Sequence, residues 1–220
     1  MAFNIDWNVS AKKLFERGVD RVVLYPRGAS GYEDAVAWEG VTNVTESPEG
    51  AEANALYAEN VKYTTLISPE TFKGKIEAFT YPDEWEACDG SLEADSGIMM
   101  GQQSRKGFGL SYRTQLGSDA VGEDLGYKIH VLYGCLASPT EKARATIAAD
   151  ANDASTFSWD FESTPVSATG FKPVSKITFD STKLTANGLA ALEDSLYGVD
   201  ATPGALLLPD ALIALVQAAS

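Results

Sequence analysis

Apolar and polar side chains alternate along three stretches of the chain between residues 72 and 137. The apolar members are Ile76 and Ala78, then Phe108, Leu110 and Tyr112, and finally Tyr127, Ile129, Val131 and Tyr133. A strand turns successive side chains to opposite faces. The pattern therefore predicts an antiparallel sheet with one face packed on a core and the other face in water.

Together with shorter patterns of the same kind, these stretches predict a chain made mostly of strands. The predicted strands are residues 21–25, 36–44, 71–81, 106–116, 127–136, 141–148 and 157–162, and a last one marked by Ile177 and Phe179. Gly40 inside the second strand suggests a bulge or a close backbone approach. Two long connections, 45–70 and 91–104, show no clear alternation, and we expect them to be irregular apart from a short strand near 61–66.

Helix signals are fewer and lie mainly at the end of the chain. Ser10 is a suitable cap for a helix over residues 10–17 that Gly18 would close, and Pro82 begins a short helix over 82–87 that ends at Gly90. Two more helices are expected within residues 185–220, where leucines recur at helical spacing. The whole order predicts a mainly β fold: an antiparallel β-sandwich or barrel with a short flanking helix and C-terminal helices.

Length and charge limit the number of domains and the kinds of partner that the chain is expected to have. A chain of 220 residues without a linker or internal repeat is expected to form a single domain, residues 1–220. Asp and Glu number 31 and Lys and Arg 17, which gives a net charge of −14. Such a surface argues against a protein that grips DNA, because gripping requires Lys and Arg against phosphate. It is compatible with DNA that slides past, and also with a plain soluble acidic protein.

The cysteines and the apolar runs bear on the compartment. Cys88 and Cys135 are far apart and form no disulfide framework, so a reducing compartment is expected. The N-terminus lacks the basic region and apolar core of a signal peptide. The last apolar run, 205–219, is too short to span a bilayer and is broken by Pro209 and Asp210. We therefore expect synthesis in the cytoplasm and no membrane partner.

Most sequence motifs of catalytic sites and metal sites are missing. His130 is the only histidine, and it lies in mid-strand, where catalytic groups are uncommon. One histidine and two distant cysteines cannot supply a structural zinc site. Residues 150–153 begin like a calcium loop but lack its central Gly and terminal Glu, so we interpret them as a turn. The sequence predicts no metal, no cofactor and no enzymatic activity.

Carboxylates beside tryptophans are the one pattern that suggests an enzyme. Such acids are Asp83, Glu84, Glu86 and Asp89 around Trp85, and Asp160 and Glu162 near Trp159. Glycosidases use two carboxylates, and aromatic rings bind sugars. A carbohydrate-binding or carbohydrate-active β-sandwich, with Trp85 or Trp159 as the sugar platform, is therefore an alternative. In so acidic a chain these neighbours also arise by chance, and Trp85 would then anchor the short helix onto the sheet.

Five segments, taken in order, resemble the major tail protein of long-tailed bacteriophages with non-contractile tails. They are residues 37–52, 76–85, 101–106, 108–114 and 127–134. The resemblance extends over about residues 20 to 200, close to the whole chain. Several long matches in one order are more specific than a single short motif.

The resemblance implies a structural virion protein. Subunits of that family form homo-hexameric rings, and the rings stack into a tail tube through which the genome leaves, with DNA as a passing cargo. Expected partners are further copies of the chain and other tail proteins, namely the tape measure, the terminator and the distal tail or tip proteins. The family supplies no catalytic residues and no cofactor. Another virion part, such as a tail terminator or a head–tail connector, is a further alternative.

The resemblance also gives the polar positions a role. A sheet with one polar face can line a watery channel. Glu77, Asp160 and Glu162 each alternate with apolar strand residues, so they are our candidates for the channel wall, which we expect to be negative. The connection 45–70 and an N-terminal arm, residues 1–19, are candidates for contacts with the next ring or a neighbouring subunit.

Overall fold

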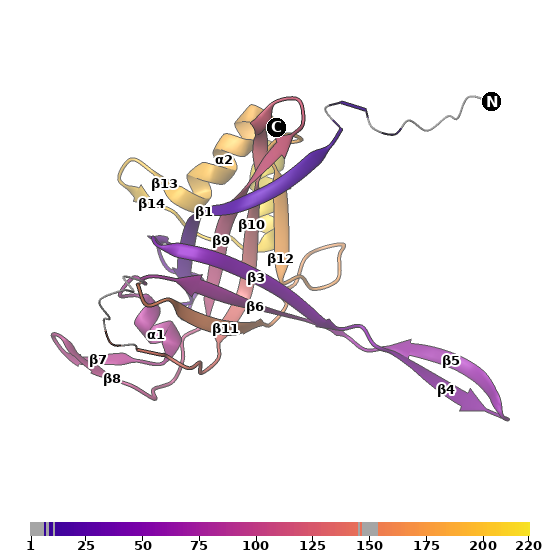
Figure 1. Ribbon diagram of the computed structural model, residues 1–220, viewed down its shortest axis with the longest axis horizontal. Helices are drawn as coiled ribbons and strands as arrows, with labels where there is room; N and C mark the ends of the chain where they lie inside the picture. Colours follow the sequence, from indigo (N-terminus) through magenta and orange to yellow (C-terminus); the bar gives the residue numbers. More distant parts are fainter. Residues whose placement is uncertain (1–6, 8, 11, 145, 147–153) are drawn as a thin grey trace.

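A large antiparallel sheet organises the computed structural model, which describes residues 7, 9–10, 12–144, 146 and 154–220 (Figure 1). In spatial order its strands are β2 (Val36–Ala37), β1 (Leu14–Pro26), β9 (Phe108–Ser118), β10 (Gly122–Ala137), β11 (Phe157–Ser163), β6 (Glu70–Ala78) and β3 (Val41–Gly50). An eighth strand, β12 (Lys176–Asp180), pairs with β10. The predicted β class is confirmed, although the sheet of the described chain does not close into a barrel.

The sheet branches in the middle of β10. Residues 128–132 of β10 pair with β12, whereas Cys135 and the two residues after it pair with β11. Gly134 lies at the change of partner with φ of 61°, and its carbonyl accepts from the Thr164 N–H at 2.9 Å. A left-handed backbone of this kind suits glycine. Beyond this bend, β11, β6 and β3 turn across β1 and β9, and a core forms between the two halves (Figure 1).

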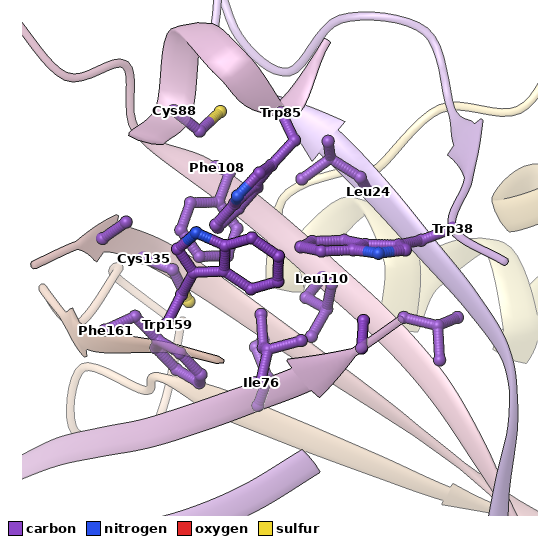
Figure 2. Packing of buried hydrophobic residues seen from close by; sticks show 14 of the residues in the cluster. Leu24, Trp38, Ile76, Trp85, Cys88, Phe108, Leu110, Cys135, Trp159 and Phe161 are labelled. Atoms are coloured by element: carbon purple, nitrogen blue, oxygen red, sulfur yellow. The ribbon is translucent and has the colours of Figure 1, made fainter. Parts of the chain in front are cut away.

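Three indoles gather in that core (Figure 2). The Trp38 and Trp85 ring centroids lie 4.6 Å apart, and Trp159 lies 5.6 Å from Trp38 and 5.5 Å from Trp85. Tilted aromatic pairs contribute roughly 0.5–1.5 kcal/mol each beyond the area they bury. Trp85 belongs to α1 (Trp85–Asp89), which Gly90 closes, and it is fully buried. The predicted anchoring of the short helix by Trp85 is confirmed.

A second core fills the opposite face of β1, β9 and β10. Ile129, Val131 and Tyr133 of β10 pack there against α2 (Ala186–Tyr197) and α3 (Pro209–Ala218). Leu192, Leu196 and Leu212 are the fully buried helix leucines in this layer. Both C-terminal helices are therefore confirmed, but the prediction of one wet sheet face is wrong for these strands. The helices cover the apolar face of β10 and the face of β9 that carries Gly109 and Ser111, while Leu110 of β9 and Leu132 of β10 pack in the first core.

Other local predictions also fail. Residues 14–17 belong to strand β1 and not to a helix, because β1 pairs with β9 from Leu14 opposite Ser118 onward. The strand predicted over 36–44 is split by a turn at Gly40, whose φ is 78°. Residues 141–144 form no strand, and the remainder of 141–148 lies partly outside the described residues, as do 150–153. In the first case tertiary pairing overrides a local helix signal.

The two connections expected to be mostly irregular form β-hairpins, and one of these contains the short strand predicted near 61–66. One is β4 (Ala53–Ala58) with β5 (Val61–Ile67), and the other is β7 (Leu92–Asp95) with β8 (Ile98–Met100). A third, very short hairpin joins β13 (Gly198–Val199) to β14 (Thr202–Pro203). The β4–β5 hairpin continues the β3–β6 ribbon away from the body of the molecule, and β7–β8 extends at the other side (Figure 1). We call β4–β5 the arm.

Candidate assembly surfaces

The outward face of β3, β6 and β11 carries all three predicted channel-wall residues. In the ladder between β6 and β11, Asp160 lies opposite Lys75, Glu162 opposite Lys73, and Glu77 opposite Ser158. Their strand neighbours Trp159 and Ile76 point the other way and are fully buried. The structure therefore brings Glu77, Asp160 and Glu162 onto one solvent-facing surface. We call this surface the polar face.

Two lysines, which the sequence analysis did not assign to this surface, share the polar face. Lys75 Nζ lies 3.0 Å from Glu77 Oε1, and hydrogen bonds from Lys75 and Asn43 lower the pKa of Glu77. Lys73 Nζ lies 2.7 Å from Glu49 Oε2, and this contact raises the pKa of Lys73. Glu77 and Lys73 are therefore held in their charged forms at neutral pH. With Asp160 and Glu162 the face holds four acids and two lysines, 2 − 4 = −2.

The arm is an isolated ribbon. Gly50 and Ala51 both have positive φ (89° and 55°) where β3 passes into it, and the Ser68 N–H donates to the Glu52 carbonyl at 3.0 Å across its root. Its tip is a two-residue turn with positive φ at Glu59 and Asn60, the geometry of a tight hairpin. Two-stranded hairpins are marginally stable alone. The arm therefore gains little stability from contacts within its own two strands.

Large apolar side chains cover the arm on both faces. Tyr57 is 70% exposed, Tyr63 77% and Ile67 70%. Leu56, Val61 and Leu66 are exposed as well. Apolar groups of this size in water mark surfaces that meet another molecule. The sequence predicted one strand of the hairpin, near 61–66, and the turn-forming Asn60 was a further signal, but the absence of a buried face weakened the apolar alternation that reveals strands.

Strand β3 is an edge of the large sheet. Its one ladder in the described chain is with β6, from Val41 to Gly50, so its other side presents unpaired backbone groups. Pro48 lies near the arm end of this edge and cannot donate a hydrogen bond. Unpaired edges template pairing with another chain. The edge before Pro48 is therefore a second candidate assembly surface.

His130 lies in a polar cluster between β1, β9, β10 and β12. Its Nε2 is 2.9 Å from Thr114 Oγ1 and 3.2 Å from Glu16 Oε1, and its Nδ1 is 3.2 Å from Thr178 Oγ1. The ring stacks on Tyr112 with centroids 4.8 Å apart. Burial, followed by the charge of Lys176, lowers the pKa of His130. The buried imidazole is neutral at pH 7 and joins four strands, out of reach of a substrate.

The cysteines and two of the tryptophans considered in the sequence are buried as well. Cys88 and Cys135 are buried thiols, and burial raises the pKa of Cys88 to about 12 and that of Cys135 further. Trp85 and Trp159 are fully buried, so neither can serve as a sugar platform. Among the residues that the structure describes, no three His, Cys, Asp or Glu side chains are grouped to hold a metal ion. None of the described helices has the length and apolarity to cross a bilayer.

Comparison with known proteins adds no assignment. No model of a known protein family matches the chain, and no curated protein matches it.

Proposed function

We propose that this chain is the major subunit of a bacteriophage tail tube, a structural protein that forms hexameric rings which stack around a channel for the genome. The observation that carries the proposal is the arm, which exposes large apolar side chains on both faces that the described part of the chain does not cover. A protein of this shape is built to contact other copies or other chains. The ordered sequence segments that resemble major tail proteins indicate which assembly this is.

Within a ring, the free edge of β3 pairs with a strand of the neighbouring subunit. Backbone hydrogen bonds then continue the sheet from subunit to subunit, which covers an edge that otherwise invites aggregation. The polar face lines the channel in this arrangement. Its net negative charge lets DNA pass without binding, because a polyanion is repelled by a wall of the same sign.

Between rings, the arm of one subunit reaches the next ring. A contact that joins two different surfaces of identical subunits does not close on itself along the axis, so it generates a filament. The segment before β1 is the second candidate for this contact, and its residues 1–6, 8 and 11 lie outside the described chain. Other tail proteins, namely the tape measure, the terminator and the tip proteins, would cap or measure the tube.

Negative-stain microscopy of the purified protein at rising concentration tests the proposal. We expect rings that stack into tubes, with or without a tail-tip complex as the nucleus. Single rings that never stack would instead indicate a terminator or connector. Particles that stay monomeric at every concentration, even with the nucleus present, would reject the proposed function.

A further inference from the structure

An apolar groove lies where the arm joins the body. It has a volume of about 890 Å³. One wall is the root of the arm, with Pro48, Ile67 and Phe72, and the other wall is the loop before β12, with Pro165, Pro173 and Val174. Prolines and a phenylalanine make flat apolar walls of the kind on which aromatic rings pack. A groove of this size accepts several side chains.

The tip of the same arm cannot fill this groove. The six residues of β4 extend about 20 Å at roughly 3.3 Å per residue, so the tip lies that far from the root that forms the groove wall. The arm leaves the body as a straight continuation of β3 and β6 (Figure 1). The groove and the arm tip of one molecule are therefore separate surfaces, and only the arm of a second copy brings them together.

The two surfaces offer one pair of opposite charges, although the groove lining also includes Glu70. Glu59 is exposed in the turn at the tip of the arm, and Lys172 is exposed on the groove wall. Within the described part of the chain neither side chain forms an ion pair. Opposite charges that meet at the rim of an apolar contact fix its register. Lys176, the other groove lysine, is already held at 2.5 Å by Glu46.

We propose that the groove is the receptor for the arm tip of the next copy, with Tyr57 and Tyr63 against its apolar walls and Glu59 beside Lys172. This inference rests on the proposed function, because it names the surface that receives the arm when subunits stack. Each subunit then contributes one arm and one groove. The repeating contact joins two different surfaces, as filament growth requires.

A single contact of this kind is weak. Two tyrosines of roughly 200 Å² each, exposed by 70% and 77%, offer about 300 Å² to the groove. A stable interface buries about 800 Å² on each partner. One arm therefore cannot hold two monomers together, whereas a ring presents several arms at once and gains from their effective concentration. The subunit accordingly stays soluble until a ring forms.

Exchange of the two charges tests the contact. Glu59→Lys or Lys172→Glu alone is expected to raise the concentration needed for tube assembly by about tenfold, or about 1.4 kcal/mol, because each change replaces an attraction by a repulsion between like charges. The double variant Glu59→Lys with Lys172→Glu is expected to return within about twofold of the unchanged protein. Circular dichroism of each variant confirms that the body is folded.

Cross-linking of assembled protein gives an independent readout. A chain with Glu59→Cys and Lys172→Cys should form a ladder of covalent oligomers on oxidation, whereas Glu59→Cys with Asp194→Cys, on the exposed side of α2, should not. The native cysteines are buried. If the unchanged protein forms tubes but the ladder and the charge rescue both fail, the arm–groove contact is wrong and the proposed function stands. If the unchanged protein never assembles, both are rejected.

Discussion

Single residues decide where this sheet changes direction. At Gly134, β10 leaves β12 and joins β11, and a Cβ at this position would lie 2.2 Å from the Thr164 carbonyl oxygen. The sequence shows only a glycine within an alternating strand, and glycines in strands have many causes. Trp85 was easier to predict, because a tryptophan beside a short helix with acidic neighbours has few places to pack except the core.

Replacement of Gly134 tests the bend. Gly134→Ala should lower the free energy of unfolding by more than 2 kcal/mol, since left-handed strain of about 1–2 kcal/mol adds to a backbone clash. Gly170→Ala is the matched control, because its φ of 81° is similar and no atom lies within 4 Å of the added Cβ. Urea unfolding measures both variants. Equal losses for the two would contradict the role of Gly134.

His130 makes the stability depend on pH. Its folded pKa lies below the ordinary 6.5, so in the window below 6.5 the unfolded chain binds a proton that the folded chain excludes. Stability therefore falls as the pH drops through that window. The charged and titratable groups around the ring are Glu16, Glu46, Tyr112, Lys128 and Lys176.

Replacement of His130 shows how much of the pH dependence of stability comes from this residue. Between a pH above 6.5 and a pH below 6.5, the free energy of unfolding should decrease less in the His130→Gln variant than in the unchanged protein. Urea unfolding at several pH values gives the two slopes, and NMR titration of the ring gives the pKa directly. A steeper slope in the variant, or a folded pKa above 6.5, would show that the sign is wrong.

At the scale of helices and strands, the elements with a buried face were those that could be predicted from the sequence. The helices α2 and α3 were found because leucines that face one core recur at helical spacing. In the arm only the strand near 61–66 was predicted, and the β7–β8 hairpin was not predicted, because neither hairpin buries a face against the described chain and apolar alternation reveals only strands with a buried face. Gly109 and Ser111, small and buried, were the sign that the second face of β9 is also packed.

Removal of the arm separates folding from assembly. The bond between Ser68 and Glu52 brings the root ends together, so residues 53–67 can be replaced by two glycines. The free energy of unfolding should change by no more than about 1 kcal/mol, because the deleted strands contribute nothing to either core. Tube formation should be lost. A large loss of stability in urea unfolding would show instead that the arm supports the body.

At the scale of the whole molecule, the arm and the edge of β3 are surfaces without a partner in the described part of the chain. The chain has a net charge of −14, but the polar face contributes only −2 of it, because this face also holds Lys73 and Lys75. Alternation placed Glu77, Asp160 and Glu162 on one face, and the structure agrees. Which surfaces meet in an assembly is a property of several chains, so no pattern within one chain reveals it.

Charge reversal on the polar face tests its place in the channel. Tubes of Asp160→Lys with Glu162→Lys should retain double-stranded DNA in a salt-sensitive manner, because Lys attracts phosphate. Asp194→Lys with Asp200→Lys changes the net charge equally on the exposed side of α2 and in the β13–β14 turn. These control tubes should release DNA as the unchanged protein does. Equal retention by both sets of tubes would place the channel elsewhere.

The mass of the soluble assemblies tests the central claim most directly. Mass spectrometry under native conditions, at rising protein concentration and with a tail-tip complex as the nucleus, counts the subunits in each species. The account predicts a species of six subunits and multiples of six as rings stack. A protein that remains monomeric, or that assembles only in numbers that are not multiples of six, would contradict it.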